Sequence, residues 1–256
     1  MLMENKLELA VKALDGTSTS RTIIVKKLCN GRNCGRNIEI AKESLDAKRA
    51  EGYNVHGNPN VCRRSRYLLT DEESIEVQGP HTSGEVEIVA VMDRGEVLIS
   101  VGSDHNDRSL ESTWTQALGK VFDSAKLKQM APAVIARNAW KYEDVKGHWD
   151  KLNLRSYVTV DDKKIPYQNF DLSSLVDLEY HFRTSPWLRE NGVVLFGGSA
   201  GILESVPSNV YQYQPSIENV FFPTDFNFEV HDPILNRNIS HSYNIITIEG
   251  PRSLSL

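Results

Sequence analysis

Two glutamates and an aspartate have the residue types and the spacing of a metal site. Glu85 and Glu87 lie two residues apart in a stretch, 85–92, whose valine and isoleucine content predicts a β-strand. Successive side chains of a strand point to opposite faces, so both carboxylates lie on one face. A second strand is predicted at 97–102, and a tight turn between the two strands brings Asp104 back beside the glutamates.

Three carboxylates that converge repel one another unless a cation or bound protons relieve them. Carboxylate oxygens suit Mg²⁺, Mn²⁺ or Ca²⁺, so we interpret the three acids as a divalent-metal site. A solvated strand end is the alternative for the two glutamates taken alone. Arg108 follows the acids and can either hold a substrate carboxylate with its planar fork or neutralise Asp104 or Asp107. For Asp107 we favour a helix-capping role.

The elements that must position these residues are mostly strands. Strands are predicted at 7–14, 22–28, 85–92, 97–102, 134–136, 155–160, 164–169, 193–196, 226–231 and 242–248, helices at 37–51, 110–125, 142–152 and 171–182, and a long loop at 203–224. Strands and helices do not alternate regularly, and several strands form hairpins. That order predicts an α+β, β-rich protein with a large, mostly antiparallel sheet rather than a doubly wound fold.

The composition is that of an ordinary globular protein. Among 256 residues, 34 are acidic and 29 basic, and the net charge of −5 argues against a nucleic-acid-binding protein. The longest apolar stretches are too short to cross a membrane, and the amino terminus lacks the apolar run of a signal peptide. The odd number of cysteines favours a reduced, cytoplasmic protein. We expect a smaller amino-terminal portion, 1–70, packed on a main domain, 71–256.

The cysteines also raise the possibility of a zinc site. Cys29, Cys34 and Cys62 could form a Cys₃His site with His56, but their spacing is irregular. We favour idle thiols.

At this point the motifs resemble a known superfamily. The pattern Glu85-Val-Glu87, followed by Ser103-Asp104 and then Arg108, is similar to the metal-binding motifs of the fumarylacetoacetate hydrolase superfamily. Further similarities follow in the same order: Ala131-Pro132, the hairpin at 155–169 and the glycine-rich stretch 192–201. The segments 82–87, 102–108, 148–150 and 154–156 resemble more closely the uncharacterised relatives called domain of unknown function 2848.

The resemblance implies a mixed β roll or pseudo-barrel with flanking helices, often a homodimer. It implies a metal-dependent hydrolase or lyase that cleaves, decarboxylates or hydrates a small oxo acid through a metal-stabilised enolate. Glu85, Glu87 and Asp104 would hold Mg²⁺, Mn²⁺ or Ca²⁺, and Arg108 would orient the substrate. Lys128 would stabilise the developing charge.

The resemblance leaves other assignments open. Lys120 and Lys126 are alternatives to Lys128 for the active lysine, and Ser199 retains the hydroxyl of a threonine that is usual in the superfamily. Related enzymes carry a His-x-x-Glu acid–base pair on a lid helix, which corresponds here to the helix at 37–51. Ser44 and Ala47 occupy the matching positions and cannot transfer protons in that way.

His56 or Glu43 could replace the missing acid–base pair, although no motif around them indicates it. The alternative function is therefore a non-catalytic relative that binds a ligand or has a structural role.

Overall fold

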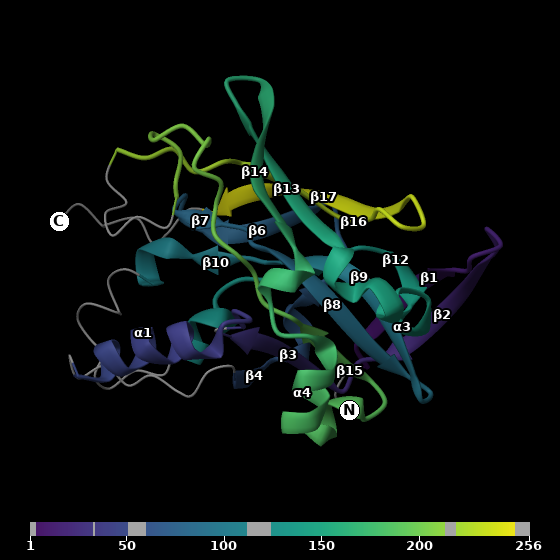
Figure 1. Cartoon of the computed structure of the whole chain (residues 1–256). Coiled ribbons are helices and arrows are strands. Elements are labelled where there is room, and N and C mark those ends of the chain that lie inside the picture. The colour runs from purple at the N-terminus through teal and green to yellow at the C-terminus, as the bar shows by residue number, and fades with distance from the viewer. Residues whose placement is uncertain (1–3, 33, 51–59, 112–123, 213–218, 249–256) are drawn as a thin grey trace.

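The chain folds into two sheets that pack face to face. The computed structural model describes residues 4–32, 34–50, 60–111, 124–212 and 219–248 (Figure 1). The larger sheet is formed by β1 (Lys6–Lys12), β2 (Ser18–Ile24), β3 (Lys27–Arg32), β4 (Asn60–Arg64), β5 (Leu69–Thr70), β8 (Val86–Asp93), β9 (Glu96–Asp104), β11 (Ala133–Ile135), β12 (Asn138–Lys141) and β15 (Val193–Phe196). The smaller sheet is formed by β6 (Ser74–Gln78), β13 (Asn153–Val160), β14 (Lys163–Asp171), β16 (Asp225–Asp232) and β17 (Arg237–Ile248).

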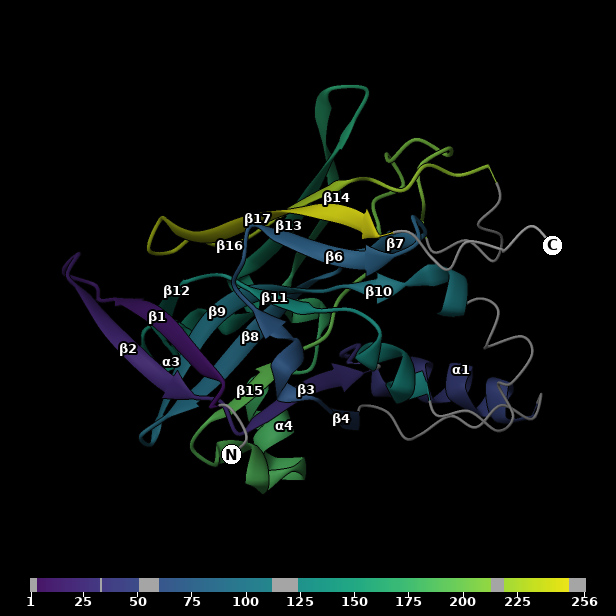
Figure 2. The same ribbon diagram turned by 180° about the vertical axis from the view of Figure 1, so that it is seen from behind.

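Short helices and one small ladder complete the described structure. The α-helices are α1 (Ile38–Ala50), α3 (Tyr142–Val145) and α4 (Leu178–Thr184), and residues 108–111 are also helical. The 3₁₀ turns are η1 (Arg66–Leu68), η2 (Ser124–Gln129), η3 (Lys146–Lys151), η4 (Leu172–Ser174) and η5 (Pro186–Arg189). β7 (Thr82–Ser83) pairs with β10 (Asn106–Asp107) beside the end of β9. Figure 2 shows α1 beside the ends of β3 and β4, on the flank of the sheets.

The larger sheet is mixed. Its strand order is β2-β1-β12-β9-β8-β15-β3-β4, with β11 paired to β9 and to β5. Most neighbours are antiparallel, but β1 pairs in parallel with β12, β3 with β15, and β11 with β5. In the smaller sheet, ordered β14-β13-β16-β17-β6, β17 and β6 are parallel. The prediction of an α+β, β-rich fold with mixed, mostly antiparallel sheets is confirmed.

Alternation along β8 separates two hydrophobic cores. Ile88, Ala90 and Met92 join the core between the two sheets, whereas Val89 and Val91 join a second core on the other face. The second core contains side chains from β2, at one end of the larger sheet, and from β3, next to the other end, which requires that sheet to curl around it. The glutamates that precede Val89 therefore lie at one end of this curled interior.

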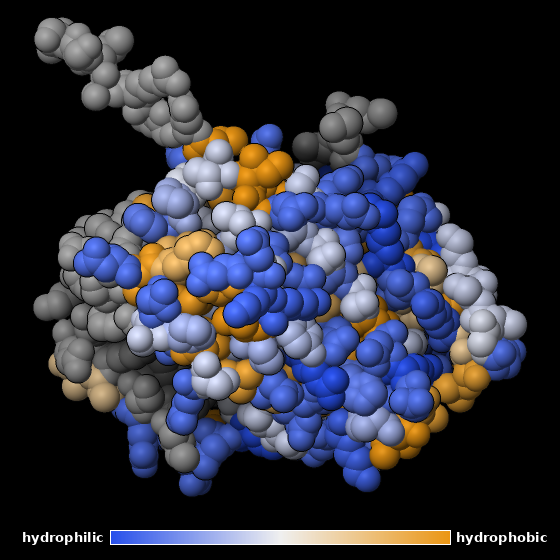
Figure 3. Space-filling view, turned by 90° about the horizontal axis from the view of Figure 1, so that it is seen from above, coloured by the Kyte–Doolittle hydropathy of each residue, from blue (hydrophilic) through white to orange (hydrophobic). Residues whose placement is uncertain are grey.

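The outer face of the smaller sheet is mainly hydrophilic. Figure 3 looks down on this side of the molecule, and polar residues cover most of it. Along β16 every second residue is buried, and the outward positions include Asn227 and Glu229. In the described part of the chain, no helix is long and apolar enough to cross a membrane.

Several predicted boundaries are wrong for local reasons. The predicted strand 22–28 is divided between β2 and β3. The helix predicted to start at Asp171 starts instead at Leu178, because Asp177 caps it by accepting a hydrogen bond from the Tyr180 amide at 2.6 Å.

Two more predicted elements differ from the structure or fall outside its description. The helix predicted at 142–152 is interrupted, since His148 leaves helical geometry. Most of the helix predicted at 110–125 lies outside the described residues.

Residue 70 does not separate the strands of the larger sheet into two groups. Strands β1 to β4 come from residues before it, and they pair with β12 and β15 from the second half of the chain. The division into 1–70 and 71–256 stays a prediction.

Candidate metal centre

The β8–β9 hairpin brings the three acids together. The register pairs Glu87 with Gly102, and the Asp104 amide donates to the carbonyl of Glu85 at 3.0 Å. Opposite residues in an antiparallel pair project from the same face, so all three carboxylates share one face. Their oxygens lie within 4.8 Å of one another. Glu87 and Asp104 are buried, while the Glu85 side chain is 15% exposed, so solvent reaches the cluster from the Glu85 side.

A glycine opposite Glu87 makes room at the centre. A Cβ at Gly102 would lie 2.5 Å from the ring of Phe196 and 2.6 Å from the carbonyl oxygen of Val134. Real side chains do not approach so closely, and one of these contacts is to backbone that cannot move freely. Only glycine fits at this position of β9.

The three acids do not share their negative charge equally. Burial raises the pKa of Glu87 well above its usual value, and the neighbouring Asp104 and Glu85 raise it further. Burial would also raise the pKa of Asp104, but Lys128 and Arg64 outweigh it and hold that pKa below its usual value. Of the two buried acids, Glu87 is therefore the one whose negative charge is less stabilised by neighbouring groups. A cation among three hard oxygen donors would supply that compensation, so the residues present fit a divalent metal.

Three basic side chains surround the acids. The Lys128 ammonium donates to Oδ2 of Asp104, and its side chain is 16% exposed. Nη2 of Arg108 donates to Oε1 of Glu85 at 2.7 Å, and Nη1 of Arg64 donates to Oδ1 of Asp104 at 2.6 Å. Three acids therefore face three bases.

Lys128 keeps its proton in this setting. Burial alone would lower its pKa, but Asp104, Glu85 and Glu87 outweigh that effect and raise the pKa. The lysine is therefore a positive charge and a hydrogen-bond donor rather than a base.

The Arg108 side chain is buried and already donates hydrogen bonds to three residues. Besides Glu85, it donates from Nε to the Ser83 hydroxyl and from Nη1 to Glu111, both at 2.7 Å. Its guanidinium also lies over the ring of Tyr211, 5.6 Å from the centroid. A substrate carboxylate would have to replace one of these partners, and the half-exposed Glu111 is the most accessible of them. Asp107 accepts from the Leu110 amide at 2.9 Å, which fits the capping role expected for it.

Ser199 lies in the loop that follows β15, but its hydroxyl is bound to Gln168 Nε2 at 2.9 Å. The same loop reaches the acids through Gly198, whose backbone hydrogen bond lowers the pKa of Glu87.

Of the two alternatives to Lys128 for the active lysine, Lys126 is exposed, whereas Lys120 lies outside the described residues.

The lid helix predicted at 37–51 corresponds to α1. Ser44 and Ala47 belong to it, and Ala47 is exposed. His56 lies outside the described residues, so its suggested role as a replacement acid or base stays open.

No second metal cluster of His, Cys, Asp or Glu occurs among the described residues. The three cysteines are free thiols, and Cys29 and Cys34 are buried. Because His56 lies outside the described residues, the preference for idle thiols over a zinc site stays a prediction.

Two polar residues at the centre, Asn30 and Arg64, were missed by the sequence analysis. Both are buried, and they come from the adjacent strands β3 and β4. No motif marks them, because an asparagine and an arginine in short strands are ordinary residues. Only the pairing of β3 with β4, which the sequence does not specify, reveals their relation to the acids.

With this geometry established, comparisons with known proteins define the family. A family model described as "Protein of unknown function (DUF2848)" matches residues 55–243, more than half of the chain. The chain belongs to this family. No curated protein matches it significantly.

Solved structures with the same fold include a crystal structure of Cg1458 with inhibitor, at 12% identity and a TM-score of 0.57, covering 94% of this chain and 89% of that one. Yeast ynq8, a fumarylacetoacetate hydrolase family protein, is 11% identical, with a TM-score of 0.56 and coverage of 91% and 97%. A 2-keto-3-deoxy-D-arabinonate dehydratase complexed with magnesium and 2,5-dioxopentanoate is 13% identical, with a TM-score of 0.55 and coverage of 90% and 77%. The fold is that of fumarylacetoacetate hydrolase proteins, as the motifs predicted.

Proposed function

We propose that this protein is a divalent-metal-dependent enzyme, a hydrolase or lyase, that acts on a small oxo acid. The observation that supports it is the cluster of three carboxylates within 4.8 Å on one face of the β8–β9 hairpin. The dehydratase of the same fold, which was crystallised with magnesium and an oxo acid, supports the choice of ligand chemistry. Mg²⁺ is the first candidate, with Mn²⁺ or Ca²⁺ as alternatives.

The charges favour an anionic substrate only when the metal is present. Asp104 accepts from Arg64 and Lys128, and Glu85 accepts from Arg108, so the three bases of the empty centre are already engaged by acids. A bound divalent metal would polarise the substrate oxygens and stabilise negative charge that develops on them. Lys128 would donate a hydrogen bond to that charge, and Arg108 would exchange Glu111 for the substrate carboxylate.

Proton transfer is the step for which this chain is least equipped. Lys128 retains its proton, and α1 carries Ser44 and Ala47 where related enzymes have an acid–base pair. Losing one positioned general acid or base typically slows a reaction by roughly 10²–10⁴-fold. We propose slow turnover, or a reaction that needs no base from this helix. The alternative is a non-catalytic relative that binds a ligand or has a structural role. It rests on the same two residues, Ser44 and Ala47.

Calorimetry with oxalate tests the metal-dependent pocket. We expect oxalate to bind in the presence of Mg²⁺ or Mn²⁺ and to bind poorly after EDTA treatment. Turnover of a panel of oxo acids, with and without the metals, then separates an enzyme from a non-catalytic binder. Absence of oxalate binding at millimolar concentration with metal would exclude the pocket, and binding without turnover would favour the alternative.

We also propose a homodimeric, cytoplasmic protein, in line with the resemblance. Light scattering coupled to size-exclusion chromatography measures the oligomeric state, and a monomeric mass would refute the dimer.

A further inference from the structure

The guanidinium of Arg64 joins three parts of the centre. Its side chain is fully buried. Nη1 donates to Oδ1 of Asp104 at 2.6 Å and to Oδ1 of Asn30 at 3.2 Å, and Nη2 donates to the carbonyl of Ala131 at 2.5 Å. Ala131 lies three residues after Lys128, so one side chain contacts the segment of the lysine and the aspartate to which that lysine donates.

Asn30 extends this network to a second acid. Its Nδ2 donates to Oε2 of Glu87 at 3.5 Å, a long hydrogen bond, while its Oδ1 accepts from Arg64. Asp104, Arg64, Asn30 and Glu87 thus form a continuous arc of buried contacts. Two of the three proposed metal ligands are linked through residues that are not themselves ligands.

The strand register explains why these two residues meet. β3 and β4 are antiparallel, with Leu28 opposite Arg64 and Asn30 opposite Cys62. Arg64 and Asn30 therefore share one face of the sheet as diagonal neighbours. On the other side of β3, Asn30 lies beside Phe196, which lies beside Val89 on β8, two residues after Glu87 on the same face.

The chemistry of these four residues indicates that Arg64 and Asn30 orient the two acids rather than stabilise the fold. Nε of Arg64 is buried and has no hydrogen-bond partner among the described residues. Burying a charged group with an unpaired donor costs free energy, and a packed apolar residue would avoid that cost. What an apolar residue or a lysine cannot provide is a rigid fork that holds several acceptors at fixed angles.

We propose that Arg64, assisted by Asn30, is a positioning residue that holds Asp104 and Glu87 in the geometry of the metal centre. This inference rests on the proposed function, because it assumes that the acids bind a metal. Arg64 contacts the ligand Asp104 and cannot itself ligate a metal, because a guanidinium offers donors and no acceptor. Its effect is on how well the ligand set is preorganised, and groups of this kind typically change metal affinity by ~10–100-fold.

Two variants of Arg64 separate positioning from simple charge repulsion. If Arg64 acted only as a nearby positive charge, R64M would bind a metal more tightly and R64K would bind it as the wild type does. If it positions the ligands, both variants bind Mn²⁺ more weakly. We expect a ~10-fold loss in R64K, which keeps the charge without the fork, and up to ~100-fold in R64M.

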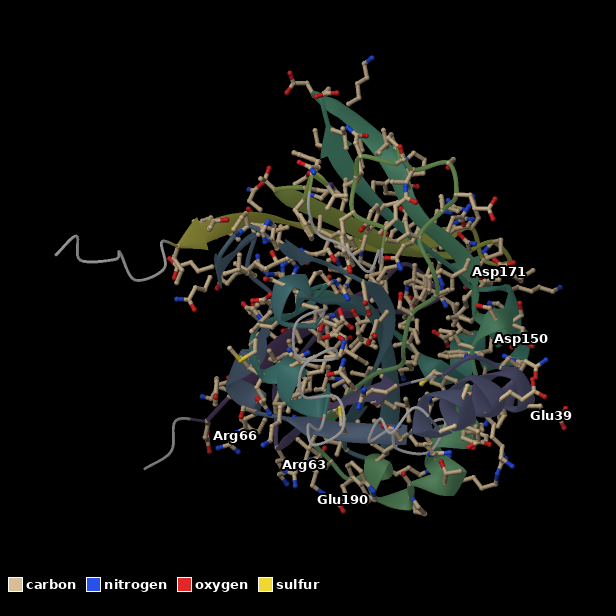
Figure 4. The ribbon with its side chains drawn as sticks, turned by 90° about the vertical axis from the view of Figure 1, so that its left-hand side faces the viewer. Glu39, Arg63, Arg66, Asp150, Asp171 and Glu190 are labelled. Carbon is tan, nitrogen blue, oxygen red and sulfur yellow. The ribbon has the colours of Figure 1, made fainter. Side chains whose placement is uncertain are left out.

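The experiment is calorimetric titration of metal-free protein with Mn²⁺, without substrate, together with the melting temperature of the metal-free proteins. Arg63 is a matched control, because it precedes Arg64 in β4 but is exposed and, by alternation, on the opposite face (Figure 4). R63M should bind Mn²⁺ as the wild type does. N30L, which keeps the branching and the number of heavy atoms of Asn30 but removes its polar atoms, should also weaken Mn²⁺ binding.

The outcomes are distinct. Wild-type affinity in R64K, or tighter binding in R64M, would overturn the positioning role while leaving the proposed metal-dependent function intact. An equal loss in R63M and R64K would also overturn it. If R64M fails to fold, the Mn²⁺ affinities of R64K and N30L test the positioning role. Absence of Mn²⁺ binding by the wild type would refute the proposed function itself.

Discussion

Glu87 shows the balance of forces at a single residue. Its carboxylate is buried beside two other acids, and the contacts that favour its charged form are a long hydrogen bond from Asn30, a backbone hydrogen bond from Gly198 and the charge of Lys128. The sequence was sufficient to predict its position, because two-residue spacing and a hairpin place the three acids on one face. The sequence was not sufficient to predict Asn30 and Arg64, which depend on the pairing of distant strands.

E87Q should separate metal binding from folding. The amide has the same shape without the charge, so it removes the repulsion from Asp104 and Glu85. We expect the metal-free variant to melt at or above the temperature of the wild type, while Mn²⁺ affinity falls by more than the ~10–100-fold typical of groups around a ligand. Scanning calorimetry and titration measure the two effects. A lower melting temperature without metal would show that the Glu87 charge stabilises the fold.

The buried position of His181 predicts that the free energy of unfolding depends on pH. This residue of α4 is buried against Cys34, with Sγ 3.8 Å from Nε2, and burial lowers its pKa to about 4, partly opposed by Asp177. Between pH 6.5 and 4 the unfolded chain binds a proton that the folded chain does not. The contribution of His181 to stability is therefore complete above pH 6.5 and decreases as pH falls.

Integrated from pH 7 to pH 5, this difference amounts to about 2 kcal/mol for His181. Urea unfolding at both pH values should show H181Q losing about 2 kcal/mol less than the wild type. H231Q is the control, since His231 lies on the outer face of the smaller sheet and hydrogen-bonds to Asn238. Equal losses in wild type and H181Q would contradict the assignment.

At the scale of elements, Gln168 connects both sheets to the loop after β15. Its Oε1 accepts from the Val86 amide and the Ser156 hydroxyl, both at 3.0 Å. Its Nε2 donates to the Ser199 hydroxyl at 2.9 Å and the Ala200 carbonyl at 2.8 Å. One buried amide on β14 thus ties the beginning of β8, between the two glutamates, to the loop that contacts Glu87.

Q168L should loosen this connection. The leucine leaves buried donors and acceptors without partners, so we expect a loss of about 2 kcal/mol or more in the free energy of unfolding, and weaker Mn²⁺ binding. Q78L is the matched control on the exposed face of β6, with an expected change within about 0.5 kcal/mol. Denaturant unfolding compares the two, and a similar, small effect in both would show that the four hydrogen bonds contribute little.

Sequence patterns predicted elements better than their ends. The strands β8, β9, β13, β14 and β15 were expected nearly where they occur, because alternation and turn residues are local signals. The start of α4 was misplaced at Asp171, because an aspartate that could cap a helix occurs there as well as at Asp177, where α4 begins. Parallel pairing was not foreseen for any strand, since it joins segments that are far apart in the sequence.

At the scale of the whole molecule, we expect the fold not to depend on a bound metal. Two cores lie on the two faces of the larger sheet, and two of the three acids, Asp104 and Glu85, are already paired with bases. We expect EDTA-treated protein to keep its near-ultraviolet circular dichroism and to unfold in a single calorimetric transition.

Adding Mg²⁺ or Mn²⁺ should raise the melting temperature with occupancy, because only the folded state holds the three acids together. No shift at saturating metal would count against the centre, and two separate transitions would favour an independent unit at 1–70.

The parallel pairings also determine when the centre can exist during synthesis. β3 carries Asn30 and needs β15, which leaves the ribosome more than 160 residues later, and β6 needs β17 at the far end of the chain. Until then β8, whose eight residues are all buried in the finished protein, has no complete sheet around it. A nascent chain of this kind exposes one unpaired edge of the apolar strand β8 until β15 is synthesised, because only β9 follows β8 directly. We therefore expect the nascent chain to bind chaperones and expression at low temperature to favour the native protein.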